Sequence, residues 1–254
     1  MANTVFANKI IEAKAKDLLT TAVNTRSLMA VDNSLAAEAG MTKTINVYTY
    51  TGSAEELAAG EGNTARGNIS YTGTDYTVKM VQQAFDYQDE DFMKDNTIVD
   101  NMLKGANQVM VNKMTSDFIA ECAKATLEQE GGVAYDTIVD AIAKMNVEDE
   151  AGIFVLVSPE GKAALRKDPD YVAARMGEVV YNGQVGTIAG IPVVVSKAIA
   201  GNGFVMHKDA IKLFMKKDVE VEQDRDADTR TNSVYLRSAY ICALVDATKI
   251  VKLA

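Results

Sequence analysis

The stretch TIVDNMLKGANQVMVNKMTSDFIAECAKATL, residues 97–127, carries the longest helical pattern in the chain. Its apolar side chains recur at helical steps and are Val99, Met102, Ala106, Met110, Met114, Phe118 and Cys122. Thr97 with Asp100 resembles a capping box, and the pair Gly131 and Gly132 ends the pattern. The predicted helix is about 46 Å long, whereas a typical globular helix has about 11 or 12 residues. A rod of this length suits an extended, flat molecule better than a compact one.

Two strand patterns and a glycine-rich segment precede this helix. Residues 44–52 (TINVYTYTG) alternate in character, and residues 74–88 (TDYTVKMVQQAFDYQ) contain a second alternation. The glycines of the intervening segment are Gly52, Gly60, Gly62, Gly67 and Gly73. We therefore expect a long two-stranded ribbon with a polar tip. A ribbon of this kind is marginally stable alone in water, so it needs a surface to lie on.

The N-terminal part predicts little regular structure. Residues 5–21 have the spacing of a short amphipathic helix. Residues 22–42 are mixed and polar, and they predict an extended or irregular arm with few anchoring residues.

The sequence after the glycine pair predicts two further units. Residues 135–203 have the pattern of a small α/β unit, with a buried strand at 152–158 and a helix that Ser158 caps. The remainder is β-rich, with strand alternation from Ile211, a long strand from Asn232 and a short terminal strand.

Composition limits the classes of function. The chain has 254 residues, 48% of them hydrophobic, which is enough for one large domain or two small ones. No apolar run reaches the roughly 18 residues of a membrane helix, and the N-terminus does not have the pattern of a secretory signal. A net charge of −9 without a basic cluster argues against tight, specific DNA binding. We expect synthesis in a cytoplasm.

Candidate catalytic and cofactor sites are weak throughout. The single histidine, His207, rules out a histidine-based triad or a multi-histidine metal site, and a turn position after a strand is expected for it. Cys122 and Cys242 predict two buried thiols, and a disulfide would require the fold to bring them together. The glycine-rich segment 60–67 lacks the terminal Lys-Ser/Thr pair of a phosphate-binding loop, and the glycines of 182–190 do not have the G-x-G-x-x-G spacing. A flexible loop or turn is expected at both. We predict no catalytic residue, cofactor or metal.

The segment DRDADTR, residues 224–230, resembles a calcium loop only at its start. The three matching ligand positions are Asp224, Asp226 and Asp228. Thr229 stands where the loop needs glycine, and Tyr235 stands where it needs a bidentate glutamate. The pattern favours a solvated or subunit-facing loop in which Arg225 and Arg230 pair with nearby acids.

Charges at the predicted ribbon tip allow two interpretations. Glu55, Glu56, Glu61 and Arg66 belong either to a solvated loop or to a docking surface whose charges set the register between neighbouring subunits. We favour the docking surface. The subunit-interface candidates are Glu55, Glu56, Glu61, Arg66, Asp224, Arg225, Arg230 and Arg237.

The order of these parts resembles the major capsid proteins of tailed bacteriophages with the Hong Kong 97-type fold, an α+β fold. The segment TIAGIPVVVSKAI is similar to their Gly-Ile-Pro-Val segment, and VEVEQDRDADTRTNSVYLRSAYICALVDATKIVKL resembles their closing strands. The resemblance implies an N-terminal arm (1–42), an extended β-ribbon called the E-loop (43–83), a peripheral domain with a long spine helix (84–134), a small α/β axial domain (135–203) and a β-rich return shared by both domains (204–254). Some members join subunits through a Lys–Asn isopeptide bond, but those positions cannot be matched here.

The resemblance implies a structural protein with no enzymatic activity and no cofactor. Such proteins assemble through hexamers and pentamers into an icosahedral shell that encloses the double-stranded DNA of a tailed phage or prophage. The ribbon would lie across the adjacent subunit. The implied partners are other copies of the chain, a portal protein and a separate scaffold or protease. The protein would face the packaged DNA without recognising its sequence, and no membrane partner is implied. The implied location is the virion capsid, after synthesis in the host bacterial cytoplasm.

Two other functions compete with this interpretation. One is an encapsulin, a bacterial nanocompartment shell of the same fold that encloses an enzyme, and the other is a small α/β enzyme. Gene neighbours would separate the two shells, and turnover by a purified monomer would support the enzyme. Under the capsid interpretation, deletion of residues 53–73 is expected to leave folded subunits that fail to assemble.

Overall fold

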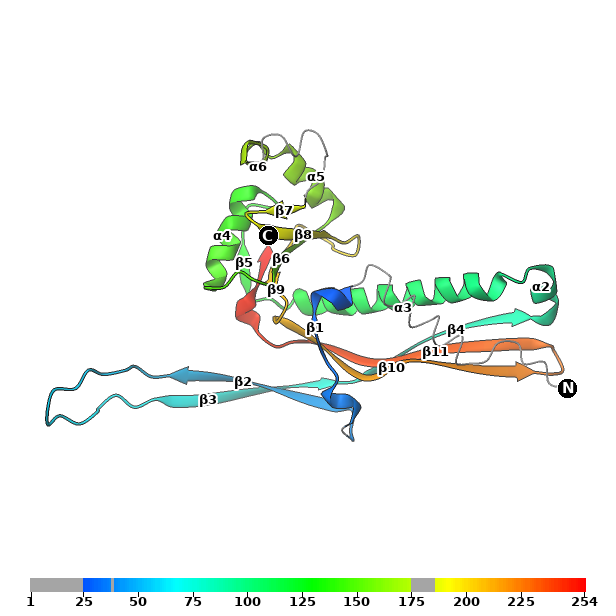
Figure 1. Ribbon diagram of the computed structural model, residues 1–254, viewed down its shortest axis with the longest axis horizontal. Coiled ribbons are helices and arrows are strands. Elements are labelled where there is room, and N and C mark those ends of the chain that lie inside the picture. The colour runs from blue at the N-terminus through cyan, green and yellow to red at the C-terminus, as the bar shows by residue number, and fades with distance from the viewer. Residues whose placement is uncertain (1–24, 38, 175–185) are drawn as a thin grey trace.

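The computed structural model describes residues 25–37, 39–174 and 186–254 of the chain. The predicted helix at 5–21 lies outside these ranges. The molecule is elongated, as Figure 1 shows: a two-stranded ribbon projects at one end, and a long helix runs over a sheet toward the other. A small α/β unit sits above the junction of the two. Within the described ranges, no helix is long and apolar enough to cross a membrane.

The long helix predicted from the sequence is α3, Ile98–Cys122. With 25 residues it is about 38 Å long. It ends before the predicted limit because a turn follows, in which Ala125 N–H donates to Cys122 O at 3.0 Å, and the chain then enters the short strand β5 (Leu127–Gln129). Its buried side chains include Val99, Leu103, Ala106, Met110, Met114, Phe118 and Cys122.

The predicted capping box at the start of α3 is wrong. The Thr97 side chain makes no capping hydrogen bond. Asp95 takes this role instead, because its Oδ1 accepts the Thr97 backbone N–H at 2.9 Å and the Thr97 hydroxyl at 2.7 Å. An aspartate two residues upstream thus competes successfully for the groups that the box would have used.

A four-stranded sheet lies under α3 in the order β1-β10-β11-β4. Its strands are β1 (Ala30–Asp32), β4 (Lys79–Gln88), β10 (Ile211–Asp226) and β11 (Thr231–Leu244). β10 and β11 pair antiparallel along their length, with irregular register between Met215 and Glu220. The short helix α2 (Asp89–Lys94) joins β4 to α3 at the far end. The strands predicted from Ile211 and Asn232 are therefore confirmed.

A six-stranded sheet in the order β5-β12-β9-β6-β8-β7 forms the α/β unit. Its other strands are β6 (Ile153–Val157), β7 (Thr187–Ile188), β8 (Ile191–Val195), β9 (Gly203–His207) and β12 (Ile250–Leu253). Its helices are α4 (Tyr135–Met145), α5 (Pro159–Lys167) and α6 (Pro169–Ala174). Residues 204–254 thus contribute strands to both sheets. The predicted cap of α5 is confirmed, because Ser158 Oγ accepts the Gly161 N–H at 3.1 Å.

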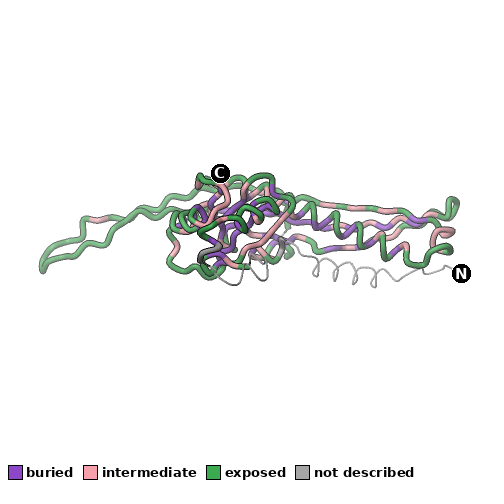
Figure 2. The backbone as a smooth tube through the Cα atoms, turned by 90° about the horizontal axis from the view of Figure 1, so that it is seen from above, coloured by how far each residue is buried: buried purple, intermediate pink, exposed green. Residues whose placement is uncertain are grey.

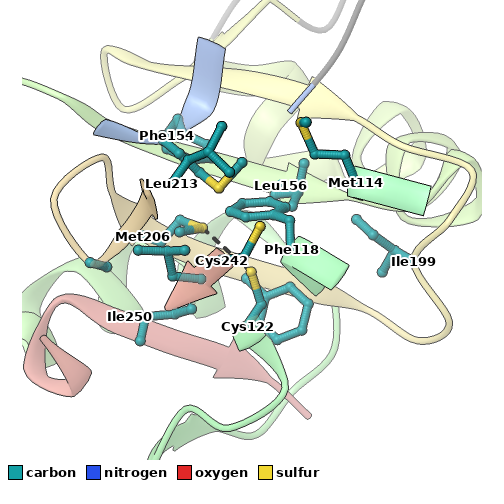
Figure 3. Close-up of a cluster of buried hydrophobic side chains, with 14 of the residues drawn as sticks. Met114, Phe118, Cys122, Phe154, Leu156, Ile199, Met206, Leu213, Cys242 and Ile250 are labelled. Atoms are coloured by element: carbon teal, nitrogen blue, oxygen red, sulfur yellow. Dashed lines mark hydrogen bonds between the residues drawn. The ribbon is translucent and has the colours of Figure 1, made fainter. Parts of the chain in front are cut away.

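A buried cluster joins α3 to both sheets, and Figure 3 shows it. Phe118 of α3 is fully buried there beside Met206 of β9. Cys122 and Cys242 are both free and buried in this cluster, which confirms the two predicted buried thiols. Burial raises the pKa of the Cys242 thiol to about 12, and burial also raises the pKa of the Cys122 thiol. Both thiols are therefore protonated and unreactive at neutral pH.

The described part of the N-terminal arm is better anchored than the sequence predicts. It contains two short 3-10 helices, η1 (Thr25–Leu28) and η2 (Ser34–Ala36), on either side of β1. Met29 and Leu35 are buried, and Lys216 Nζ donates to Leu35 O at 3.0 Å. Two well-placed apolar side chains and one parallel strand pairing are enough to fix a segment whose sequence has no clear period.

His207 closes a turn, as expected. It is the last residue of β9. Its Nε2–H donates to Ala151 O at 2.8 Å, and its Nδ1 accepts the Asp209 N–H at 3.1 Å. The ring is thus used on both nitrogens to hold two loops together.

Candidate interaction surfaces

The ribbon consists of β2 (Thr42–Thr51) and β3 (Asn68–Thr77), which pair antiparallel and are joined by the tip, residues 52–67. It projects away from the body (Figure 1), and most of its length is exposed (Figure 2). The second predicted strand, 74–88, is divided at Val78 into the end of β3 and the whole of β4. β3 also begins earlier, at Asn68, in a segment that lacks apolar alternation because neither of its faces is buried.

One face of the ribbon is aromatic. In the register of the ribbon, Tyr48 lies opposite Tyr71 and Tyr50 lies opposite Ile69, which places all four on the same face. We call this set the tyrosine face. The side chains of the three tyrosines are each 65% exposed, and the Tyr48 and Tyr71 rings lie 6.3 Å apart between centroids. The opposite face carries threonine and serine side chains, with Val47 exposed and Ile45 buried at the root.

Two glycines at the base of the tip make room for the Tyr50 ring. A Cβ atom at Gly67 would lie 2.0 Å from Tyr50 Oη, and one at Gly52 would lie 2.7 Å from the same atom. Any side chain at either position would displace the ring. The glycines therefore let the Tyr50 ring pack closely against the backbone at the base of the tip.

The tip is organised by Glu55. Its carboxylate accepts the backbone N–H groups of Thr64 at 2.8 Å and Ala65 at 3.0 Å, together with the Thr64 hydroxyl. These hydrogen bonds hold the pKa of Glu55 below its ordinary value, and the one from the Ala65 amide has the largest effect. Glu56, Glu61 and Arg66 are exposed, and none has an ion-pair partner within the described part of the chain.

Replacement of Glu55 by alanine is expected to loosen the tip. The Glu55→Ala variant leaves the two amides of Thr64 and Ala65 to water, so proteases should cleave within residues 52–67 several-fold faster. Limited proteolysis with mass spectrometry of the fragments measures this rate. Glu56→Ala is the matched control and should cleave at the wild-type rate. Equal rates in both variants and the wild type would show that Glu55 does not order the tip.

The root of the ribbon is fixed to the body. Ile45 and Val78 are buried in a cluster that includes Phe214 of β10. Val78 N–H donates to Met41 O at 2.7 Å, where the chain passes from β3 to β4. Tyr76 Oη donates to Leu244 O at 3.3 Å. The direction in which the ribbon leaves the body is therefore set within one subunit.

The aspartates in the turn between β10 and β11 accept hydrogen bonds from groups of the same turn. Asp226 accepts the Asp228 N–H and the Thr229 hydroxyl, each at 2.9 Å, and Asp224 Oδ1 accepts the Arg225 N–H at 2.9 Å. Arg230 has φ of +55°, at the end of a tight turn. Across the described ranges, no group of three acidic, histidine or cysteine side chains is placed to hold a metal ion.

Three arginines of this region form ion pairs within the chain. Arg225 contacts Asp89 at 2.6 Å and Arg230 contacts Glu90 at 2.7 Å, so the expected pairing of both with nearby acids is confirmed. Arg237, in the middle of β11, contacts Glu222 at 2.6 Å. The first two pairs join α2 to the β10–β11 hairpin, and the third joins β11 to β10.

The Asp89–Arg225 pair gives an expected pH dependence. Hydrogen bonds from Arg225 and then Asn232 hold the pKa of Asp89 below its ordinary value. A lowered carboxyl pKa stabilises the folded state above the unfolded value of about 3.9, and this contribution is lost as the pH falls through the folded pKa. In Arg225→Ala, the Asp89 pKa should rise toward the ordinary value, as a carbon-detected NMR titration of the isolated subunit would show. Arg237→Ala should leave it unchanged, and an unchanged Asp89 pKa in Arg225→Ala would contradict the assignment.

A groove lies between residues 80–83 of β4 and the middle of α3. β4 is the last strand in the order of its sheet, so one of its backbone edges has no partner strand among the described residues. Met80 of β4 and Val109 of α3 line the groove and are 61% and 50% exposed. Gln82, Gln83 and Lys113 also line its volume of about 340 Å³, and each is bonded within the chain, to Arg237, Ala84 O and Asp117 respectively. We call this feature the β4 groove.

Comparisons with known proteins agree on one class. A family model described as "Phage capsid protein" matches residues 71–253. The "Major capsid protein" of Staphylococcus phage phiMR11 is 25% identical over 234 residues, which cover 89% of this chain and 85% of that protein.

Solved structures with similar folds include shells of several origins. A structure of Mycobacterium phage Che8 has a TM-score of 0.67 at 18% identity and covers 88% of each chain. The capsid of an empty GTA particle has a TM-score of 0.73 at 12% identity, over 91% of this chain and 88% of the other. A virus-like particle from Pyrococcus furiosus has a TM-score of 0.67 at 11% identity, over 97% and 98%.

Proposed function

The chain belongs to the phage capsid protein family, and on that premise we propose that it is a major capsid protein that assembles through hexamers and pentamers into an icosahedral shell. The family match spans residues 71–253, which include the long helix and strands of both sheets. The fold is the Hong Kong 97-type capsid fold that the resemblance implied. The proposed contents of the shell are the double-stranded DNA of a tailed phage or prophage.

We assign the parts of the fold to the parts of such a subunit. The ribbon is the E-loop, α3 is the spine helix of the peripheral domain, and the six-stranded sheet with α4 and α5 is the core of the axial domain. The arm and domain boundaries are those proposed from the sequence. The eight charged candidates, from Glu55 to Arg237, are proposed to lie at subunit interfaces, where those of the ribbon tip would set the register between subunits.

The exposed ribbon is the observation that carries this proposal. A single copy leaves ten-residue strands projecting with three tyrosines each 65% exposed. Monomeric proteins rarely expose a contiguous apolar surface of this kind. The apolar face of the ribbon is therefore proposed to be covered by another copy of the chain.

The charge of the chain suits a wall that faces DNA without binding its sequence. The net charge of −9 repels packed phosphates. A portal protein and a separate scaffold or protease are the further proposed partners. The proposed location is the virion, after synthesis in the host cytoplasm.

A shell that encloses a protein cargo is the second candidate. The likeness to the Pyrococcus furiosus virus-like particle, which extends over 97% of this chain, keeps it open. The family match and the curated phage relative favour the phage shell. Particle contents separate the two, since nuclease-protected DNA supports the phage shell and a co-purifying enzyme supports the cargo shell.

Electron microscopy and analytical ultracentrifugation of the expressed protein test assembly. We expect closed particles of megadalton mass, from the protein alone or co-expressed with the scaffold from its own genome. A species that stays at the 27.4 kDa of one chain in both preparations would contradict the proposal.

A further inference from the structure

We infer that residues 30–37 of the arm act as a strap that fixes the angle between the ribbon and the body. This segment, which we call the strap, contains β1 and η2. The inference rests on the proposed function and deepens it, because it gives the arm control over the geometry of the contact that the ribbon makes with another copy. The features brought together are the buried side chain of Leu35 and the buried root residues Ile45 and Val78.

The strap lies where the arm, the sheet and the ribbon meet. It runs from beside α3 to the root of the ribbon, as Figure 1 shows. β1 pairs parallel with β10 over Ala30–Asp32, and η2 packs against the same strand. Only residues 38–41 separate the strap from Thr42, where β2 begins. A displacement of the strap therefore acts directly on the first strand of the ribbon.

Leu35 is the apolar residue that the strap contributes to the ribbon root. It is 2% exposed and belongs to the same buried cluster as Ile45 of β2 and Val78, which lies between β3 and β4. Phe214 of β10 is also part of this cluster. Loss of the Leu35 side chain would leave a cavity in the cluster that holds the ribbon root.

Polar contacts hold the strap in one conformation. Lys216 Nζ donates to Leu35 O at 3.0 Å. Within the strap, Ser34 N–H donates to Asp32 Oδ1 at 2.8 Å. This hydrogen bond has the largest effect in holding the pKa of Asp32 below its ordinary value, and the positive charge of Lys43 adds to it. Because Lys43 belongs to β2, charge attraction reinforces the apolar contact between the strap and the ribbon.

The strap can be released while the core of the body stays intact. β1 is the outermost strand at its edge of the sheet, and it is held by three residue pairs with β10. The pairing of β10 with β11 and of β11 with β4 does not involve it. The two buried clusters that include side chains of α3 contain no residue of the strap. Release of the strap therefore changes the ribbon root and leaves the packing of α3 in place.

The ribbon converts a small rotation at its root into a large displacement at its far end. β2 and β3 each have ten residues, so each strand is about 33 Å long. A rotation of about 10° at the root would move the far end of such a strand by about 6 Å. Since the ribbon is proposed to contact another copy, its angle sets the angle between neighbouring copies and hence the curvature of the shell. The strap is thereby a determinant of particle size.

Hydrogen exchange of the dissociated subunit tests the strap without the need for particles. In Leu35→Ala, the amides of residues 42–45 and 74–78 should exchange about ten-fold faster than in the wild type, because the root loses a buried contact. The amides of α3 should keep their wild-type rates. Val31→Ala is the matched control, since Val31 lies in the strap but is 42% exposed, and its root amides should exchange at the wild-type rate.

Electron microscopy of assembled particles tests the control of geometry. Particles of the wild type and of Val31→Ala should have one diameter, whereas those of Leu35→Ala should show a spread of diameters. If Leu35→Ala does not fold, Lys216→Met takes its place in both experiments, because it removes the hydrogen bond to Leu35 O without opening a cavity at the root.

The outcomes separate the inference from the proposed function. Unchanged exchange at the root, equal acceleration in α3, or particles with the single wild-type diameter would overturn the strap and leave the shell function standing. Loss of all particles in Leu35→Ala, with exchange as expected, would support the strap, because the ribbon would no longer point toward its neighbour. If the wild type forms no particles, with or without its scaffold, the proposed function fails, and the exchange comparison still decides whether the strap holds the ribbon root.

Discussion

Excision of residues 47–72 is expected to yield a folded subunit that forms no particles. Asn46 and Gly73 lie opposite each other in the ribbon register, so the excision joins them as an Asn-Gly pair. Asn-Gly is the preferred sequence for a two-residue hairpin turn, and Ile45 and Thr74 remain paired behind it. The buried root is thus kept while the tip and the tyrosine face are removed. Particle yield by ultracentrifugation should fall at least 100-fold.

This excision is cleaner than the deletion of residues 53–73 suggested by the sequence. That deletion would remove six of the ten residues of β3 and leave residues 46–51 of β2 without partners. Circular dichroism and thermal unfolding of the excised chain should match those of the dissociated wild-type subunit. Particles formed at the wild-type yield would show that the ribbon is dispensable, and an unfolded chain would show that the ribbon belongs to its own core.

Replacement of Phe118 by alanine is expected to destabilise the subunit by about 3–5 kcal/mol. Phe118 is fully buried where α3 meets both sheets, so the variant leaves a cavity that the surrounding strands cannot fill. A domain of this size is typically stable by about 5–15 kcal/mol, so the change is a large part of the whole. Urea unfolding of the excised, unassembled subunit measures it.

Gln108→Ala is the matched control for this change. Gln108 lies on the same helix but is exposed, so its replacement should alter the unfolding free energy by less than about 0.5 kcal/mol. A loss below about 1 kcal/mol for Phe118→Ala would contradict the packing of α3 against the two sheets.

Most of the helices and strands of the body could be predicted from the sequence. The helical period of α3 and the alternation in β10 and β11 are visible because each element buries one face in its own chain. β6 was equally visible, since all five of its residues are buried. In these elements, local pattern and tertiary burial agree.

The ribbon shows why other elements could not be predicted from the sequence. β3 begins at Asn68, but its first eight residues are exposed on both faces, so they have no apolar period to recognise. The sequence drew attention to charges at the tip. The tyrosine face follows instead from the register, which places Tyr71 opposite Tyr48. The available signal was the spacing of Tyr48 and Tyr50, two residues apart on one strand.

The partners of side chains that pair over long sequence distances could also not be predicted from the sequence. Arg225 and Arg230 were expected to pair with acids, but only the fold places Asp89 and Glu90 beside them. The anchoring of the arm by Leu35 depends likewise on Lys216, far along the chain. Pairings of this kind are set by topology, which no local period encodes.

The central claim is that the ribbon of one copy becomes ordered and covered only by contact with another copy. Hydrogen exchange of the ribbon backbone tests this claim most directly. We expect amides of residues 46–51 and 68–73 to exchange within seconds in the dissociated subunit, because an isolated two-stranded ribbon is marginally stable. In assembled particles the same amides should be protected at least 100-fold. Equal protection in the dilute, dissociated subunit would show that a single molecule already holds its ribbon and would contradict the account.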